Sequence, residues 1–282
     1  MGAGVSSEYG RLRRVLLCPP THQQWTPITT LAKANLAAGK VFDREKAIRE
    51  HAGFAKFIQD RGVEVVWVEA GPGLGVQVFT RDLGSGHPDG VLLGRFKYDS
   101  RRPEMPLTRE ALAKAGIPVV GEVAKGVLEG GDFHYLAPGL VVVGRAERTD
   151  DEGIDDAARY LPGWEIVRMS VPKEFHHSDC VFVVIGERLC VACLEALEPR
   201  FRLFLRERKF TIIDVPLGES RKVGSNMVAL DPGTILSHRS SHLVNERLRA
   251  LGFEVLEADL EMISGQGGGP RCLTFPLERD KV

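Results

Sequence analysis

The sequence lacks the features that mark membrane proteins, nucleic-acid-binding proteins and disulfide-rich secreted proteins. No segment approaches the roughly 20 apolar residues of a membrane span, and the start of the chain has no apolar signal-peptide core. The formal net charge of -1 gives no electrostatic reason to expect nucleic acid or an anionic membrane as a partner. The five cysteines are an odd number without regular spacing, as is typical of a reducing compartment. We therefore expect a cytoplasmic protein that binds neither nucleic acid nor membranes.

The sequence also lacks a linker or low-complexity run that would divide it. Its 282 residues can form one large domain or two small ones. A content of 43% hydrophobic and 27% charged residues is that of an ordinary globular protein. Without a dividing segment, we expect residues 1–282 to form a single domain.

Five segments share one pattern, in which a helix end is followed by a turn and then by an apolar strand. These segments are 57–68, 111–120, 160–167, 205–215 and 248–256. A shorter apolar strand precedes the helix of each segment, and a third strand follows, so the predicted unit is strand, helix, strand, strand. The third strands are predicted at 77–79, 133–136, 180–185, 227–230 and 273–277. The unit recurs about every 45–55 residues, a period typical of repeat architectures.

No single unit can bury its apolar faces alone, but five units arranged in a ring share a core around a central axis. The predicted fold is therefore an α/β propeller of five blades with pseudo-fivefold symmetry. The alternative is an α/β fold without symmetry, in which the similarity of the segments is coincidental. The glycine-rich stretches Gly71–Gly75 and Gly84–Gly90 are interpreted as loops flanking a site.

Polar residues cluster directly beside the predicted third strand of every unit. The clusters are Thr80–Asp82, Glu129–Asp132, His176–Asp179, Gly224–Asn226 and Arg271–Cys272. In a ring of similar units, equivalent positions converge on the axis. Asp82, Glu129, His177, Asp179 and Cys272 are therefore expected to line one pocket, although they lie far apart in the sequence.

The last of these clusters follows a flexible stretch, Gly265–Thr274, with four glycines and one proline. Such a backbone can bend closely around a small ligand. Cys272 stands beside the positive charge of Arg271, and a nearby positive charge favours the thiolate, which is the nucleophilic form of cysteine. The alternative is a tight turn followed by a structural cysteine in the core.

Six motifs in chain order make the sequence resemble the guanidino-group-modifying superfamily, which includes arginine deiminases, dimethylarginine dimethylaminohydrolases and arginine:glycine amidinotransferases. They are Ser7–Leu17, Phe79–Asp82, Glu129–Asp132, Glu147–Thr149, His177–Asp179 and Arg271–Cys272. The resemblance covers the whole chain. It implies a five-bladed α/β propeller, known as a pentein, with the active site on the axis, in agreement with the repeat.

The resemblance and the chemistry of the side chains assign the same catalytic roles. Because resonance spreads the charge of a guanidinium, its carbon is a poor electrophile and needs a strong nucleophile. Cys272 would attack that carbon as a thiolate and form a thiouronium intermediate. His177, held by Glu129, would protonate the leaving nitrogen and then activate water.

Four further residues are expected to bind the substrate. Asp82 and Asp179 can form paired hydrogen bonds with guanidinium N–H groups. The resemblance implies in addition that Arg148 and Arg101 bind a substrate carboxylate. The expected partner is thus a small guanidino compound.

Several members of the superfamily remain candidates for the reaction. Asp179 favours a substrate with an unmethylated guanidinium, because a dimethylated nitrogen has no hydrogen to donate. The length of 282 residues is nearer that of the dimethylarginine enzymes than of long arginine deiminases. Relatives that hydrolyse arginine twice typically carry Asn in place of Asp82. We predict a hydrolase that converts arginine or a related compound to a citrulline-type product and ammonia or amine. The alternatives are an amidinotransferase and a catalytically silent binding protein.

Other cysteines and histidines give no sign of a metal or cofactor. Cys190 and Cys193 lie in a predicted strand without a second Cys or His pair at ligand spacing, so no metal site is expected there. The glycines before Cys272 lack the following Lys-Ser/Thr of a phosphate loop. His238 and His242 have no assigned role. No cofactor is expected, and assembly into homo-oligomers is left open.

Overall fold

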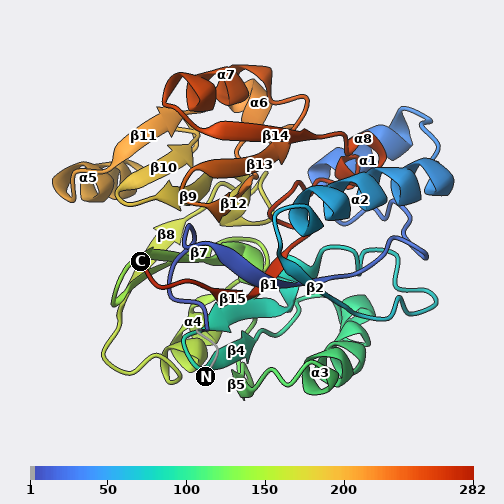
Figure 1. Cartoon of the computed structure of the whole chain (residues 1–282), viewed down its shortest axis with the longest axis horizontal. Helices are drawn as coiled ribbons and strands as arrows, with labels where there is room; N and C mark the ends of the chain where they lie inside the picture. The colour runs from blue at the N-terminus through green and yellow to red at the C-terminus, as the bar shows by residue number, and fades with distance from the viewer. Residues whose placement is uncertain (1–3) are drawn as a thin grey trace.

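The computed structural model describes residues 4–282 and contains five separate sheets, each of three strands. Figure 1 shows these sheets with helices outside them. In chain order of their middle strands, the sheets are β15(Phe275–Arg279)–β1(Leu12–Leu17)–β2(Glu64–Trp67), β3(Gly84–His87)–β4(Gly90–Leu93)–β5(Val119–Glu122), β6(Phe133–Ala137)–β7(Leu140–Arg145)–β8(Glu165–Ser170), β9(Phe182–Gly186)–β10(Leu189–Ala192)–β11(Thr211–Asp214) and β12(Val228–Asp231)–β13(Thr234–His238)–β14(Glu254–Ala258). The predicted five-bladed α/β propeller is confirmed.

Every sheet has the same internal order. Its first two strands are antiparallel, and its third strand is parallel to the middle one after a crossover that contains at least one helix. One sheet joins the two ends of the chain, because β15 pairs antiparallel with β1, with Val15 opposite Pro276. The C-terminal strand therefore closes the ring, and it brings the segment before β15 next to the start of the chain.

The helices lie on the outside of the sheets in Figure 1. They are α1(Thr30–Ala37), α2(Arg44–Gln59), α3(Glu104–Lys114), α4(Asp151–Ala158), α5(Pro199–Glu207), α6(Leu217–Ser220), α7(His242–Ala250) and α8(Glu261–Ser264). Asp43 caps α2 by accepting a hydrogen bond from the backbone N–H of Lys46 at 2.9 Å. Ala55 and Ile58 of this helix are buried, whereas Ile48 is 43% exposed. Among residues 4–282, no helix is both long and apolar enough to cross a membrane.

The limits of the repeating unit differ from the prediction. In four of the five units, the predicted third strand pairs antiparallel with the first strand of the next unit around the ring, so the blades are offset by one strand. Residues 77–79 form a turn, and the strand expected there is β3, within the stretch Gly84–Gly90 that was interpreted as a loop. A Cβ at Gly86 would lie 2.5 Å from Cγ2 of Val5 and 2.8 Å from the carbonyl oxygen of Pro276. Close packing requires glycine at this position of the strand. Because glycine has a low strand propensity, the sequence did not indicate a strand here.

Short polar turns precede the first strand of each sheet. Three are 3₁₀ turns, namely η1(Thr80–Leu83), η3(Gly130–Asp132) and η4(Ser178–Cys180). The corresponding segments before β12 and β15 are irregular and contain Asn226 and Cys272. Since the sheets repeat, these five turns lie at one end of the ring and bring their polar side chains together.

Candidate active site

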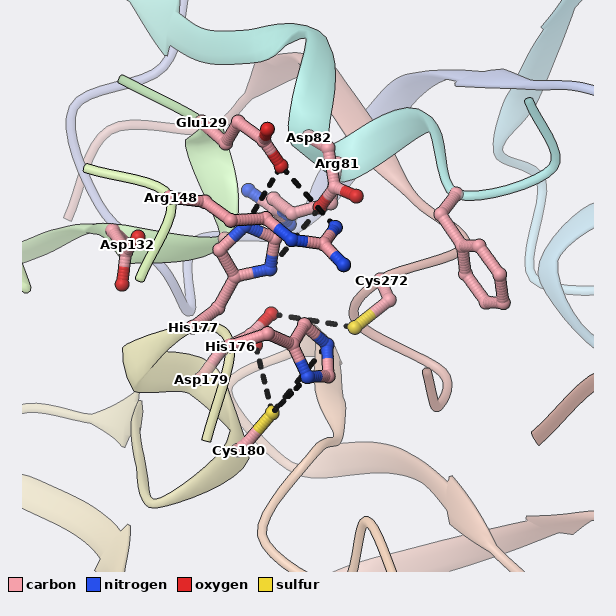
Figure 2. Close-up of polar contacts among 12 residues, drawn as sticks. Arg81, Asp82, Glu129, Asp132, Arg148, His176, His177, Asp179, Cys180 and Cys272 are labelled. Atoms are coloured by element: carbon pink, nitrogen blue, oxygen red, sulfur yellow. Dashed lines mark hydrogen bonds and ion pairs between the residues drawn. The ribbon is translucent and has the colours of Figure 1, made fainter. Parts of the chain in front are cut away.

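The five residues expected to line one pocket lie together in the structure (Figure 2), and all are buried. Only Asp82 and Cys272 among them line the cavity described below, whereas the other three lie behind its lining. Asp82 lies on η1, Glu129 directly precedes η3, and His177 directly precedes η4. Asp179 lies on η4, and Cys272 comes from the loop before β15. Four turns from four different sheets therefore contribute to one site.

The imidazole of His177 lies between two carboxylates. Its Nε2 is 2.9 Å from Oε2 of Glu129, and its Nδ1 is 3.5 Å from Oδ1 of Asp82. Burial disfavours the charged ring, but Asp82, the hydrogen bond to Glu129 and the charge of Asp132 outweigh it and raise the pKa of His177 to about 9. The ring is therefore an imidazolium at neutral pH.

Glu129 is held as a carboxylate. Burial would raise its pKa, but Arg148 and His177 together lower the pKa of Glu129 to about 2. Arg148 Nη1 lies 3.5 Å from Oε2 of Glu129, and the backbone N–H of Lys97 donates to Oε1 at 3.2 Å. The carboxylate is thus fixed on both oxygens, one of which orients the imidazole.

Arg101 is bound to carboxylates of the protein. Its Nε and Nη2 donate to the two oxygens of Glu104 at 2.8 and 2.9 Å, and its Nη1 pairs with Asp82. Nη2 also donates to the carbonyl oxygen of Phe79 at 3.2 Å. Arg101 therefore positions Asp82. Arg148 has a free hydrogen-bond donor, because its Nε has no hydrogen-bond partner among residues 4–282.

Asn226 clamps the cysteine loop. Its Oδ1 accepts hydrogen bonds from the backbone N–H groups of Arg271 and Cys272 at 2.9 and 3.2 Å. Its Nδ2 lies 3.1 Å from Sγ of Cys272, which in turn lies 3.6 Å from Oδ2 of Asp179. A side-chain N–H is thus aimed at the sulfur, where it can stabilise a thiolate.

The expectation that the charge of Arg271 makes Cys272 easy to ionise was wrong. Burial, followed by the negative charges of Asp179 and Asp82, raises the pKa of the Cys272 thiol well above its ordinary value. The guanidinium of the neighbouring Arg271 points to Asp179 instead, with Nη1 3.1 Å from Oδ2. Although Arg271 is next to Cys272 in the sequence, its positive charge is directed to Asp179 and not to the sulfur.

Glycine is required in the cysteine loop for close approach. A Cβ at Gly268 would lie 2.3 Å from the ring of Phe79, and one at Gly269 would lie 2.9 Å from Oδ1 of Asn226. Gly267 has φ of 109°, a conformation that other residues rarely adopt. The glycine run therefore serves the packing of this loop against η1 and Asn226.

The cavity beside Cys272 is lined by Asp82, Arg101, Arg148, His176 and Cys272 and by apolar and backbone groups, namely Ile28, Thr29, Val76, Phe79 and Gln266–Gly268. It contains about 10 Å³ of free space, enough for one water molecule. Its lining includes Ile28 and Thr29, and the segment they belong to is tied to Gln266, whose Oε1 accepts from the backbone N–H of Thr26 at 2.8 Å. Entry of a substrate larger than a water molecule therefore requires part of the lining to move.

Three residues without a predicted role belong to the site. Besides Asn226, Asp132 accepts hydrogen bonds from Thr149 Oγ1 and from the backbone N–H of Ser178, both at 2.7 Å. His176 lines the cavity, with Nε2 3.8 Å from Sγ of Cys180. The repeat placed all three in polar clusters, but no sequence signal separated them from ordinary turn residues.

One set of residues has the geometry of a metal site. Ligand atoms of Asp82, Glu129 and His177 lie within 4.8 Å of one another. However, Arg101 Nη1 pairs with Asp82 and lies 3.9 Å from Glu129, and Arg148 also contacts Glu129. Guanidinium groups thus already compensate both carboxylates and would repel a divalent cation. These three residues therefore do not favour the binding of a metal ion. That the protein works without a metal stays a prediction.

Comparison with known proteins gives the family. The model of the eukaryotic N,N dimethylarginine dimethylhydrolase family matches residues 26–279. The chain belongs to this family, within the guanidino-group-modifying pentein superfamily. It is an enzyme of the cysteine-dependent guanidino hydrolase class, of the dimethylarginine dimethylaminohydrolase and arginine deiminase type.

Three individual proteins illustrate what the chain is similar to. The uncharacterized protein YkgA of Bacillus subtilis (strain 168) is 30% identical over 273 residues, which cover 97% of this chain and 94% of YkgA. The arginine deiminase of Oenococcus oeni is 25% identical over 253 residues, 72% of this chain and 61% of that protein. The N-terminal domain of ArgZ, an arginine dihydrolase from cyanobacteria, has the same fold, with a TM-score of 0.84 and 23% identity over 94% of this chain and 97% of that chain.

Proposed function

We propose that the protein hydrolyses a C–N bond of a small guanidino substrate through a covalent thiouronium adduct on Cys272. The observation that carries this proposal is the close grouping of one thiol, one imidazolium and two carboxylates, of which Cys272 and Asp82 line the cavity. Cys272 provides the nucleophile and His177 the proton, while Asp82 and Asp179 offer acceptors for the N–H groups of a guanidinium.

The substrate itself activates the thiol. Burial and the charges of Asp179 and Asp82 raise the pKa of the Cys272 thiol. A guanidinium bound between these carboxylates neutralises their charge and places a positive charge beside the sulfur, so the pKa of the thiol falls when substrate binds. Asn226 Nδ2 then donates to the thiolate. The nucleophile is formed only when there is a carbon for it to attack.

The leaving nitrogen is placed beside His177 Nδ1 and Asp82 Oδ1. His177 Nδ1 and Asp82 Oδ1 face each other at 3.5 Å, and neither has another partner within residues 4–282. Sulfur attacks the guanidinium carbon and the S–C bond forms. The C–N bond then breaks as Nδ1 gives its proton to the departing nitrogen, which leaves as ammonia or amine.

The same imidazole serves the second half of the reaction. After it has given up its proton, His177 is neutral, with Nε2 still held by Glu129. Its Nδ1 takes a proton from water, and the oxygen of that water attacks the thiouronium carbon. Breaking of the S–C bond releases a ureido product and returns the sulfur as thiolate.

The favoured substrate has an unmethylated guanidinium and a carboxylate. Two buried carboxylates offer acceptors for N–H groups at both ends of the guanidinium, which arginine satisfies and a dimethylated nitrogen satisfies only at one end. The open Nε of Arg148 makes it the better candidate for the substrate carboxylate, since Arg101 is bound by Glu104 and Asp82. Dimethylarginine is the second candidate, because the matching family is named for that substrate.

The direct test is a screen of arginine, methylated arginines, agmatine and guanidino acids for ureido product and released amine. We expect turnover of at least one of them, and none by the Cys272→Ser variant, because a serine hydroxyl is barely ionised near neutral pH. Cys193→Ala, a change at a buried thiol outside the site, is the matched control and should retain turnover. Wild-type turnover in a folded Cys272→Ser variant would contradict the proposal.

A further inference from the structure

Behind the cysteine loop lies a group of buried charges that the proposed reaction does not use. It consists of Glu8, Arg81, Arg271 and Arg279, here called the axial arginine cluster. Arg81 precedes Asp82 on η1, and Arg279 ends β15. All three guanidinium side chains are buried, with residue exposures of 3% or less.

The cluster has more positive than negative charge. Arg271 pairs with Glu8, with Nη2 3.3 Å from Oε1, and with Asp179, with Nη1 3.1 Å from Oδ2. Within residues 4–282, neither Arg81 nor Arg279 forms an ion pair. Two carboxylates thus face three guanidinium groups, and Arg271 is the only arginine that they contact.

Hydrogen-bond donors in the cluster also lack acceptors. Nη2 of Arg81 and both Nε and Nη2 of Arg279 are buried without a partner among the described residues. The remaining contacts of these two side chains are to backbone carbonyl groups, those of Arg271 for Arg81 and of Gly10 and Ala229 for Arg279. The nearby His134 adds no negative charge. Burial and the charges of Arg271 and Arg81 lower the pKa of His134, and its Nδ1 has no partner among the described residues.

The excess of buried positive charge is energetically unfavourable, and together with burial it shifts the pKa values of two of the arginines. Burial and the charge of Arg271 lower the pKa of Arg81 to about 9 and that of Arg279 to about 10, although Glu8 acts in the opposite direction. Water can accept the free N–H groups but cannot compensate the charge. A buried charge needs a partner of opposite sign.

We infer that the axial arginine cluster binds a small monovalent anion of the halide class, chloride in the cell, between Arg81 and Arg279. A halide accepts several N–H donors at once and supplies the missing negative charge. Arg271 lies between this cluster and the active site, since its Nη1 binds Asp179 and its Nη2 binds Glu8. The anion is therefore structural, and its presence does not depend on which substrate the enzyme uses.

Crystals grown in sodium bromide in place of chloride test the inference by anomalous diffraction. We expect a bromide peak within hydrogen-bonding distance of Arg81 Nη2 and of Arg279 Nε or Nη2. Absence of that peak, with the cluster hydrated by water alone, would overturn the inference.

A solution measurement supplements the crystals. At constant ionic strength, replacing sodium gluconate by sodium chloride should raise the melting temperature of the wild-type protein in a saturable manner, because only the folded state binds. Arg279→Gln should lose this halide dependence, whereas Arg13→Gln, at an exposed arginine, should retain it. If Arg279→Gln does not fold, the bromide crystals and the wild-type titration decide. A melting temperature indifferent to the halide at constant ionic strength would count against the site.

Discussion

Asn226 holds Cys272 by both ends of its amide, since Oδ1 accepts the backbone N–H of Cys272 at 3.2 Å and Nδ2 lies 3.1 Å from its sulfur. The substitution Asn226→Asp keeps the shape and the acceptor but removes the donor and adds a negative charge. Both changes disfavour the thiolate, so we expect kcat/KM to fall by about 10- to 100-fold, the effect of losing one hydrogen bond to a charged group.

The companion measurement is the rate of Cys272 alkylation against pH in the presence of a guanidinium ligand. Asn226→Asp should shift this profile to higher pH. Unchanged alkylation and unchanged kcat/KM would show that Nδ2 does not act on the sulfur. Ser225→Ala, one residue away and not in contact with the sulfur, is the matched control.

The pH dependence of activity should have a falling limb set by His177. Its pKa is raised to about 9, so the imidazolium that protonates the leaving group is lost as pH rises through that value. Since the folded-state pKa lies above the ordinary value of 6.5, the stabilising contribution of this group is complete below about pH 6.5 and disappears by about pH 9.

Glu129→Gln identifies the origin of that limb. Loss of the carboxylate that favours the charged imidazole should move the falling limb of kcat/KM to lower pH. If the falling limb stays at the same pH in Glu129→Gln, the limb reports the titration of a group other than His177. Asp156→Asn, a carboxylate far from the cavity lining, should leave the profile unchanged.

Asp179 is expected to distinguish substrates. With Asp179→Asn, activity should fall severely for arginine and less for dimethylarginine, because the lost acceptor serves a free N–H group. The change also leaves Arg271 without one of its two carboxylate partners, so thermal unfolding must be followed in parallel. Equal losses for both substrates would remove the argument for an unmethylated guanidinium.

The segment that lines the cavity at Ile28 and Thr29 gives a prediction for Gln266. Its side chain holds Thr26 through a bond to the backbone N–H at 2.8 Å and one to the carbonyl oxygen at 3.0 Å. Gln266→Ala should loosen residues 26–29 and speed the alkylation of Cys272 in the free enzyme by several-fold. Gln59→Ala, at the exposed end of α2, is the control. An alkylation rate equal to that of wild type would show that another segment limits access.

Much of this architecture is predictable from the sequence because it repeats. Five apolar strands with a glycine or turn before them indicated the blades, and the polar residues beside them indicated the end of the ring that carries the site. The strand Gly84–His87 escaped prediction, because its glycines reflect close packing against Val5 and Pro276 rather than local preference.

The electrostatics of the site could not be predicted in the same way. Arg271 adjoins Cys272 in the sequence, yet its guanidinium binds Asp179 and Glu8, and the thiol pKa rises instead of falling. Arg101 is likewise directed to Asp82 and Glu104. Both outcomes depend on which buried carboxylate a long side chain reaches, and this information lies in the packing between blades.

The covalent adduct is the most direct test of the proposed mechanism. His177→Ala cannot activate water, so any adduct that forms should accumulate on the peptide containing Cys272 when the sample is quenched in acid with excess substrate and measured by mass spectrometry. In the wild-type enzyme, the adduct should discharge to water at a rate that an added amine such as glycine does not change. A guanidino product formed in the presence of the amine would identify an amidinotransferase instead. No adduct on Cys272 under any condition, in a folded protein that turns over guanidino substrates, would contradict the account.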